Sequence, residues 1–409
     1  MKNEERDHKK LGPRLGLFYI DPVVGKGLPM FLPKGAVIKR ELEKFIVEEE
    51  TRRGYQHVAT PDIARLALYQ KSGHYPYYQD SMYAPIVIDD EQFMLRPMTC
   101  PHHFQLYLAA PHSYRELPLR IAELAKLYRY EQSGEIMGLQ RTRAMCLADA
   151  HIICADEQQA EQEIGGALDL IEYVAGILGL KLNEHYRYRL SLGDRTNDKK
   201  YFKNDAAWAK GEALLRALMR RRGSEFEEAK NEAAFYGPKI DIQMRNINGK
   251  EDTAFTVQYD FCMPERFDLT YIDSRGGRQR ALVVHRSSIG TTERIIAFLI
   301  EHYAGAFPLW LAPVQVAVLP IGEKQNDYAR KVFTELKTND IRTEINLDNH
   351  TLGKKIRDGK AQKIPYLAVI GDKEIANGKL TVGGRREKLE NISLPNFLTK
   401  IREEISSKK

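Results

Sequence analysis

The segment 145–153 is typical of a β-strand and carries an aspartate and a histidine two residues apart. Successive side chains of a strand alternate between its faces, so Met145, Leu147, Asp149 and His151 share one face. A carboxylate and an imidazole placed in this way can contact the same small ligand. The pair alone is weak evidence, because such pairs are more often polar surface than a binding site.

Two further residues carry ligand chemistry but are equally unspecific when taken singly. Cys100 lies in the segment Arg-Pro-Met-Thr-Cys-Pro at 96–101, and His285 lies at the end of an expected strand. A lone histidine at the end of a strand is more often a satisfied core residue than a metal ligand.

The elements that must position these residues follow from hydrophobic periodicity and turn residues. Helices are expected at 34–53, 62–71, 156–178, 206–222 and 288–302. Strands are expected at 55–60, 83–88, 92–95, 118–130, 144–154, 234–244, 254–261 and 281–285. Strands joined by hairpins and long insertions favour an antiparallel α+β sheet over regular βαβ units.

The pattern changes after Pro313. Strands expected at 314–319, 341–346, 366–370 and 380–382 alternate with helices at 323–336, 351–360 and 396–406. We therefore predict two domains, a large α+β domain over 1–312 and a smaller α/β domain over 313–409.

Composition narrows the class of protein. The 409 residues are 43% apolar and 29% charged, a composition typical of a globular protein. The formal net charge of +6 is compatible with a polyanionic partner. The four cysteines are too few and too scattered for a disulfide framework. The charged N-terminus is no secretory signal, and no stretch of about 20 apolar residues could cross a membrane. We expect a reduced, cytoplasmic protein.

Four segments in order (96–102, 149–151, 234–239 and 285–286) resemble the catalytic domain of the threonyl-tRNA synthetase family. The loop 128–134 resembles motif 2 of class II aminoacyl-tRNA synthetases, and 288–294 resembles motif 3. The first long helix, the strand after it and Pro61 resemble motif 1, through which the family forms homodimers. The resemblance covers nearly the whole chain. It implies a class II antiparallel sheet flanked by helices, followed by an α/β anticodon-binding domain.

The family's metal site matches Cys100, His151 and His285, which implies one Zn²⁺ per subunit. Three protein ligands with an open position are typical of a catalytic rather than a structural zinc site. Asp149 matches the residue that receives the hydroxyl group of L-threonine. Valine, nearly isosteric with threonine, would be rejected because its methyl group cannot coordinate a metal.

The other site residues are also implied by the resemblance. The catalytic residues would be Arg129, Arg294, Lys239 and His74, the last of them in an exposed loop. The residues for ATP, which enters with Mg²⁺, would be Arg129, Glu131, Arg141, Met145, Gln258 and Arg294. The threonine pocket would include Met98, Asp149, Tyr236 and Lys239. Asn349 and Glu374 would contact the anticodon of tRNA(Thr).

The sequence departs from the family at four positions near the site. Met145 replaces an aromatic residue that stacks on adenine, and Leu147 replaces a glutamine that contacts the amino acid. Thr253 and Phe255 stand where the family has glutamine and glycine. Gly383 stands where an arginine is usual in the anticodon domain, and Arg385 or Arg386 could replace that arginine.

These departures leave alternatives open beside threonine–tRNA ligation. They are a paralogue that activates another amino acid, an enzyme that acylates an acceptor other than tRNA, and a non-catalytic tRNA-binding regulator. The chain begins where the catalytic domain of the family begins, so we expect no editing site within it. Whether it is a whole protein or part of a larger one stays open.

Overall fold

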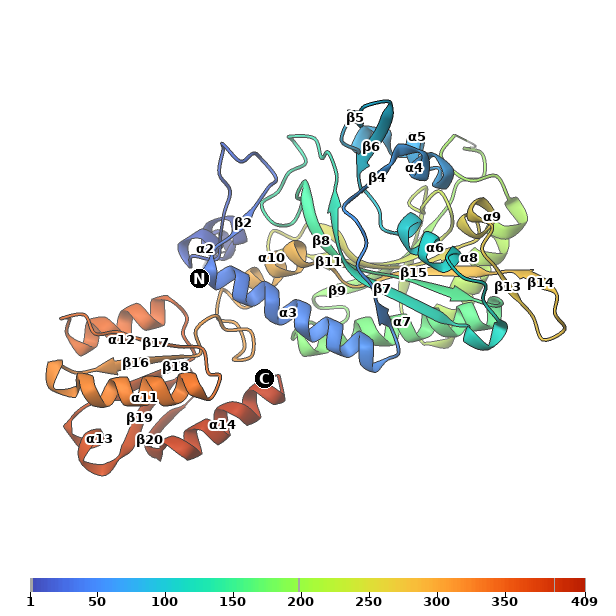
Figure 1. Ribbon diagram of the computed structural model, residues 1–409. Helices are drawn as coiled ribbons and strands as arrows, with labels where there is room; N and C mark the ends of the chain where they lie inside the picture. Colours follow the sequence, from blue (N-terminus) through green and yellow to red (C-terminus); the bar gives the residue numbers. More distant parts are fainter. Residues whose placement is uncertain (1–2, 198, 386, 409) are drawn as a thin grey trace. The chain divides into compact units, whose positions relative to one another are not determined.

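The computed structural model describes residues 3–197, 199–385 and 387–408, which divide into two compact units (Figure 1). The larger unit comprises Ile20–Pro29 and Glu43–Phe298. The smaller unit comprises Met1–Tyr19, Met30–Leu42 and Leu299–Lys409. The domain boundary at 312/313 stays a prediction.

An eight-stranded sheet forms the centre of the larger unit, in the order β10-β9-β11-β12-β15-β8-β7-β3. Its neighbours pair antiparallel except β10 with β9 and β3 with β7, which confirms the expected α+β class. The strands are β3 (Gln56–His57), β7 (Leu119–Tyr128), β8 (Ala144–Cys154), β9 (Tyr186–Leu192), β10 (Phe226–Lys230), β11 (Lys239–Arg245), β12 (Glu251–Asp260) and β15 (Leu282–Thr291).

Helices cover both faces of this sheet. On one face α7 (Glu157–Ile177) packs on β8, β12 and β15, and it also contacts α8 (Asp205–Arg221) (Figure 1). The Asp156 side chain caps α7 by accepting from the N–H of Gln159. On the other face lie α6 (Cys100–Leu108), which contacts β8, and α9 (Met263–Phe267), which contacts β15.

The remaining elements of the larger unit are short. They include β4 (Ile63–Arg65), α4 (Leu66–Ser72), α5 (His74–Tyr77), β5 (Ile86–Ile88), β6 (Glu91–Leu95), β13 (Thr270–Ile272) and β14 (Arg278–Arg280). The helix α3 (Pro33–Arg52) agrees with the helix expected at 34–53.

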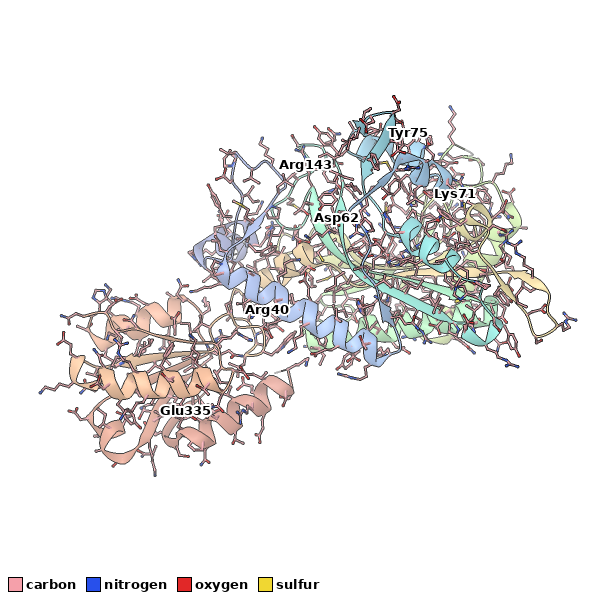
Figure 2. The ribbon with its side chains drawn as sticks, viewed as in Figure 1. Arg40, Asp62, Lys71, Tyr75, Arg143 and Glu335 are labelled. Carbon is pink, nitrogen blue, oxygen red and sulfur yellow. The ribbon has the colours of Figure 1, made fainter. Side chains whose placement is uncertain are left out.

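The helix expected over 62–71 is wrong in its first turn. Residues 63–65 form β4, which pairs antiparallel with β6, and the helix begins only at Leu66. Asp62, labelled in Figure 2, joins this sheet through its carbonyl, which accepts from the N–H of Arg96 at 2.9 Å. Tertiary pairing therefore overrides the local helical pattern.

The helix expected over 288–302 also begins later, at Thr292 (α10, Thr292–His302). β15 continues to Thr291 because it still pairs with β8 beyond a register shift, where Thr291 opposes Leu147. Strands β9 and β10 and helix α6 were not predicted. In β9 the alternation of Tyr186, Tyr188 and Leu190 with arginines is a strand signal.

The smaller unit contains a five-stranded sheet in the order β17-β16-β18-β19-β20, whose first three strands are parallel. Its strands are β16 (Val316–Pro320), β17 (Thr343–Ile345), β18 (Tyr366–Ile370), β19 (Lys379–Gly384) and β20 (Lys388–Ser393). Its helices are α11 (Asn326–Thr338), α12 (Leu352–Ala361), α13 (Asp372–Asn377) and α14 (Leu394–Ser406).

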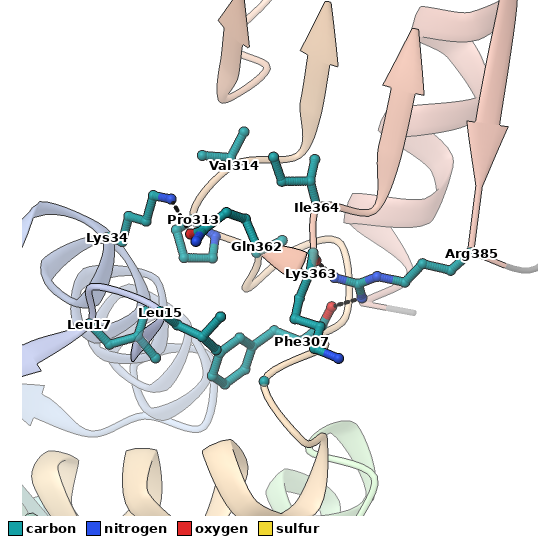
Figure 3. A pocket seen from close by; sticks show the side chains of 12 residues that line it. Leu15, Leu17, Lys34, Phe307, Pro313, Val314, Gln362, Lys363, Ile364 and Arg385 are labelled. Carbon is teal, nitrogen blue, oxygen red and sulfur yellow. Dashed lines mark hydrogen bonds between the residues drawn. The ribbon is translucent and has the colours of Figure 1, made fainter. Parts of the chain in front are cut away.

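Alternating residues of β16 serve two cores in this unit. Val316 and Val318 pack with residues of α11 and α14, whereas Ala317 and Leu319 pack towards α12. The unit also holds α1 (Asn3–Arg6), α2 (His8–Arg14), the β1 (Phe18–Tyr19) and β2 (Met30–Phe31) pair, and a small pocket (Figure 3). No helix of the described ranges has the length and apolar character that a bilayer crossing requires.

Candidate active site

A cavity of about 510 Å³ opens on the sheet face of the larger unit, over β8, β12 and β15. It brings together eleven of the residues that the sequence singled out for the site. They are Met98, Cys100, Arg129, Met145, Asp149, His151, Tyr236, Lys239, Gln258, His285 and Arg294. These residues come from separate segments of the chain, so the sheet and the start of α6 assemble the site.

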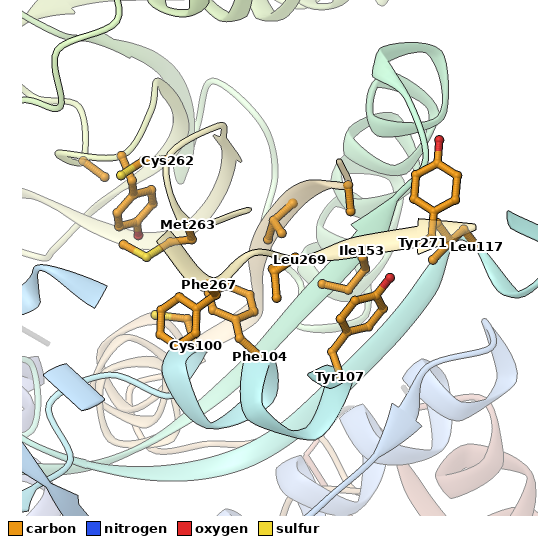
Figure 4. Close-up of a cluster of buried hydrophobic side chains, with 14 of the residues drawn as sticks. Cys100, Phe104, Tyr107, Leu117, Ile153, Cys262, Met263, Phe267, Leu269 and Tyr271 are labelled. Carbon is orange, nitrogen blue, oxygen red and sulfur yellow. The ribbon is translucent and has the colours of Figure 1, made fainter. Parts of the chain in front are cut away.

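Cys100, His151 and His285 each offer one ligand atom, and these atoms lie within 4.8 Å of one another. The antiparallel register of β8 and β15 pairs His151 directly with His285, and Cys100 is the first residue of α6. Cys100 also belongs to a hydrophobic cluster with Phe104 and Met263 (Figure 4). One thiol and two imidazoles around an open cavity are a donor set that suits zinc.

Burial governs the protonation of this triad. It raises the pKa of the Cys100 thiol well above its ordinary value, and the carboxylates of Asp149 and Asp260 add to the effect. Burial also lowers the pKa of His151 well below its ordinary value. The His151 imidazole is therefore neutral, which is the form that binds a metal.

Asp149 lies beside the triad, with its Oδ2 atom 3.9 Å from Nε2 of His151. Burial raises the pKa of Asp149, although a hydrogen bond from Thr99 opposes this rise. A carboxylate at this place can accept a hydrogen bond from the hydroxyl group of a ligand that also contacts the triad.

Aromatic stacking and one hydrogen bond hold the part of the cavity lining beside His285. The Tyr236 ring stacks on His285 with 4.8 Å between centroids, and its hydroxyl donates to Oε1 of Gln258. Lys239 donates to the buried carboxylate of Asp241 at 2.9 Å. The Tyr236 and Gln258 side chains are thereby oriented towards the cavity.

Two arginines give the cavity a positive wall. Arg129 donates from Nε to the carbonyl of Pro97 at 3.2 Å, and Arg294 donates from Nε to the carbonyl of Gln140 at 2.8 Å. Arg294 also donates to the carbonyl of Thr253. Held guanidinium groups of this kind suit a phosphate-bearing ligand.

Three residues predicted for catalysis or ATP binding do not line the cavity. Glu131 and Arg141 lie in the loop between β7 and β8, where Nε of Arg141 donates to Oε2 of Glu131 at 2.9 Å. His74 is fully buried, so its placement in an exposed loop was wrong. Its Nε2 lies 3.6 Å from the Cys100 sulfur, and burial lowers the pKa of His74 to about 3.

The departures from the family pattern separate into two groups. Met145, Leu147 and Thr253 line the cavity, as the strand alternation predicted for the first two. Phe255 is only 1% exposed and does not line it. The register shift between β11 and β12 sets Phe255 opposite Ile242 and Thr253 opposite Gln243, so the strand bulges at the residue between them.

The cavity also contains residues that the sequence did not single out. They are Tyr78, Thr99, Leu127, Lys200, Asn231, Glu232, Ala233, Ala234, Ala254, Thr256, Arg286, Ser287 and Thr291. Thr256 was accessible to prediction because it alternates with Gln258 on β12. Lys200 and Asn231 come from loops without periodicity, so no sequence signal identified them.

The predicted anticodon residues belong to the smaller unit. Asn349 is exposed, whereas Glu374 accepts from the Thr381 hydroxyl at 2.6 Å and from the N–H of Gly371 at 2.9 Å. The Arg385 guanidinium donates to the backbone carbonyl of Ala306 at 2.9 Å, so this side chain is engaged with the main chain of its own unit. Arg386 lies outside the described residues.

Comparison with known proteins agrees with this geometry. Residues 85–303 match the family described as tRNA synthetase class II core domain (G, H, P, S and T), and residues 315–404 match the anticodon binding domain. Threonine–tRNA ligase of Geobacillus sp. (strain WCH70) is 48% identical over 404 residues, which cover 98% of this chain and 62% of the relative. Threonine–tRNA ligase of Staphylococcus carnosus (strain TM300) is 46% identical over 100% of this chain and 63% of the relative.

Solved structures show the same similarity. The crystal structure of the RNA binding domain of threonyl-tRNA synthetase from Cryptosporidium parvum Iowa II has a TM-score of 0.91 and 33% identity, covering 97% of this chain and 98% of that chain. Putative threonyl-tRNA synthetase ThrRS-1 from Aeropyrum pernix has a TM-score of 0.85 and 28% identity, covering 99% and 96%. The chain spans about three fifths of the length of the curated relatives that it matches. The chain belongs to the threonyl-tRNA synthetase family of class II tRNA synthetases.

Proposed function

We propose that this chain is a threonine–tRNA ligase, which activates L-threonine with ATP and transfers it to the 3′ end of tRNA(Thr). The observation that carries the proposal is the convergence of Cys100, His151 and His285 with Asp149 on one cavity. The cationic wall of the same cavity supports a nucleotide beside the amino acid.

In this proposal the protein acts by positioning and by stabilising charge. Arg129 would hold the α-phosphate during attack by the threonine carboxylate, and Arg294 would contact adenine and the γ-phosphate. Gln258 and Met145 would line the nucleotide site. Glu131 and Arg141 form an ion pair with each other in the structure. This pair would have to separate before either side chain could contact ATP.

Cys100, His151 and His285 would hold one Zn²⁺ per subunit. The bound ion would act as a Lewis acid that coordinates the amino and hydroxyl groups of threonine. Asp149 would accept a hydrogen bond from the threonine hydroxyl. Met98, Tyr236 and Lys239 would close the pocket around the amino acid. Mg²⁺ would accompany ATP and neutralise the phosphates.

His74 requires a different role from the one expected of an exposed residue. Its fully buried ring contacts Cys100, so we assign it to the support of this ligand rather than to direct contact with the tRNA ribose. Asn349 and Glu374 would contribute to anticodon recognition in the smaller unit.

The test is amino-acid-dependent ATP–pyrophosphate exchange with all twenty amino acids, followed by charging of tRNA(Thr). We expect exchange with threonine and a weaker signal with serine, which lacks one methyl group worth about 1–3 kcal/mol. Strong exchange with another amino acid would instead identify a paralogue whose specificity Leu147 and Thr253 have changed. Absence of exchange with every amino acid would favour a non-catalytic tRNA-binding protein.

We also propose that the protein is a cytoplasmic homodimer that associates through its motif 1 region. Exposed apolar side chains near this region support a covered surface: Ile63, Ile86, Val87 and Ile88 are 46%, 44%, 65% and 53% exposed. Light scattering should show a dimer for the wild type and a shift to monomer for Val87→Lys. Ile375→Lys, at a 39% exposed position in the smaller unit, is the matched control. No disulfide joins the four cysteines, all of which lie within the described ranges, and this fits the proposed reducing compartment.

The domain boundary at 312/313 belongs to the same proposal. The two family matches end at 303 and begin at 315, which supports a boundary between them.

A further inference from the structure

One of the two ring nitrogens of His285, Nε2, has a fixed hydrogen-bond partner, the carboxylate of Asp260. Its Nε2 lies 2.6 Å from Oδ2 of Asp260, which is 0% exposed. The other oxygen of Asp260 accepts from the N–H groups of Cys262 and Met263 at 2.8 and 2.9 Å. The carboxylate is thus anchored and can only accept, so His285 carries its proton on Nε2 and presents Nδ1 as a lone pair.

His151 has a longer but equivalent connection. Its Nδ1 lies 2.8 Å from Nδ1 of His103, and Nε2 of His103 lies 3.2 Å from Oε2 of Glu123. Because Glu123 accepts, His103 donates from Nε2 and its Nδ1 must be the acceptor. His151 therefore donates from Nδ1 and presents Nε2, the atom that lies 3.9 Å from Asp149.

Glu123 is itself held in place as an ionised acceptor. Oε2 accepts from the Thr60 hydroxyl at 2.8 Å, and Oε1 accepts from Nη1 of Arg96 at 3.0 Å. Burial by itself would raise the pKa of Glu123, but the hydrogen bonds from His103 and Thr60 and the charge of Arg96 lower it to about 2. The carboxylate is therefore charged at neutral pH.

We infer that Asp260, and Glu123 acting through His103, are positioning residues that select opposite tautomers for the two histidines of the triad. Asp260 keeps the proton of His285 on Nε2, which leaves Nδ1 unprotonated. The Glu123–His103 pair keeps the proton of His151 on Nδ1, which leaves Nε2 unprotonated. The lone pairs of these two nitrogens and the Cys100 sulfur can then bind one metal ion. Hydrogen-bond partners of this kind typically contribute 10–100-fold to metal affinity. The inference rests on the proposed zinc site and names the residues that prepare it.

The experiment measures zinc affinity by competition with a chromogenic chelator, starting from metal-free protein. Asp260→Asn is nearly isosteric: its Oδ1 can still accept the two backbone N–H groups, which turns the amide NH₂ towards His285. That donor forces the opposite tautomer, so we expect zinc affinity to fall 10–100-fold. His103→Phe, which removes the acceptor for His151, should have an effect of the same size.

Two further variants separate positioning from general damage. His103→Asn places an amide oxygen near the position of Nδ1 and should return zinc affinity to within a few-fold of wild type. Glu163→Gln changes a buried carboxylate that binds Arg120 at 2.6 Å, away from the triad, and should leave zinc affinity unchanged. Thermal unfolding of each metal-free variant shows whether that variant is folded. If Asp260→Asn does not fold, the zinc affinities of His103→Phe and His103→Asn test the inference.

Wild-type zinc affinity in both Asp260→Asn and His103→Phe would overturn the inference and leave the proposed function intact. If the wild type itself binds no zinc, the proposed zinc site fails instead. The inference is then decided by ring ¹⁵N shifts of the metal-free protein. A proton on Nε2 of His285 and on Nδ1 of His151 supports it, and the reverse pair overturns it.

Discussion

Cys100 occupies the point where a hydrophobic cluster meets the cavity, and its burial raises the pKa of the thiol well above the ordinary value. The thiolate, which is the form that binds metal, therefore needs a bound cation to stabilise it. At this scale the site is a set of side chains whose surroundings oppose their charged forms. A positive ligand would reverse that preference for the Cys100 thiolate and the Asp149 carboxylate, and it would reinforce the neutral form of His151.

Cys100→Ala should lose most of the bound zinc and reduce threonine activation by orders of magnitude. Removal of one buried heavy atom should cost only about 1 kcal/mol of unfolding free energy, so the variant should fold. Metal content and ATP–pyrophosphate exchange check the result. Cys262→Ala is the control, since Cys262 is 0% exposed in the same cluster but is not one of the three ligand candidates. Normal threonine activation by metal-free Cys100→Ala would show that zinc is not needed for substrate choice.

Met145→Phe restores the aromatic residue that the family has at this position. Met145 packs against Ala125 and Leu127 at the cavity wall, so a ring can extend into the cavity. Stacking of a base on an aromatic ring is worth about 1–3 kcal/mol, and a polarisable methionine already supplies part of this. The KM for ATP in the exchange reaction should stay equal or fall. A collapse of kcat would mean that the wall is built specifically around methionine.

At the scale of elements, the site depends on how β12 and β15 approach each other beside the motif 3 helix. Gly290 has φ +64°, and a Cβ atom there would lie 2.0 Å from the carbonyl oxygen of Ala254. This is the close approach that only glycine permits. The contact lies four residues before Arg294, so the strand geometry directs this arginine into the cavity.

Gly290→Ala should therefore both destabilise the protein and weaken ATP use. Gly249 has φ +79° with no atom within 4 Å of the added Cβ, so Gly249→Ala measures backbone strain alone, at about 1–2 kcal/mol. Gly290→Ala should lower the free energy of unfolding by more than this and raise the KM for ATP. Equal effects of the two substitutions in denaturant unfolding would contradict the close approach.

Glu123 on β7 connects three elements, and its contribution should depend on pH. Its pKa is lowered from the ordinary 4.5 to about 2, so the stabilisation is complete above pH 4.5 and is lost as the pH falls towards 2. The metal-free wild type should exceed metal-free Glu123→Gln by about 3 kcal/mol of unfolding free energy at pH 7. Urea unfolding over this pH range should show the difference shrinking to near zero. A constant difference would contradict the assignment.

At the scale of the molecule, the class II core match and the anticodon-binding match cover different stretches of the chain. The candidate site lies wholly within the larger unit, and the predicted anticodon residues lie within the smaller one. The two half-reactions should therefore respond separately to substitutions. Under the proposed function, activation would need only the cavity, whereas charging would also need recognition of the tRNA.

Asn349→Ala should leave threonine-dependent exchange unchanged and reduce kcat/KM for charging of tRNA(Thr). Loss of one hydrogen bond to an unstacked base, about 1.4 kcal/mol, corresponds to roughly a tenfold decrease. Asn396→Ala, at another exposed asparagine of the same unit, should behave as wild type in both assays. An equal loss in exchange would place Asn349 in the activation step.

Periodicity and motif order were enough to predict the α+β class and most of the elements around the site. They also placed Met145 and Leu147 on the cavity wall, because strand alternation is a local property that needs no knowledge of the partner strand. The triad itself could be predicted only from the resemblance, since Cys100, His151 and His285 are separated by more than fifty residues each.

Tertiary structure decided the rest. Pairing with β6 turned residues 63–65 into a strand, and pairing with β8 extended β15 to Thr291, against the local helical pattern in both places. Burial of His74 and the connection of Glu123 through His103 to His151 depend on side chains that meet only after the sheet has formed. Long-range pairing sets which groups lie side by side, and no local pattern of residues records it.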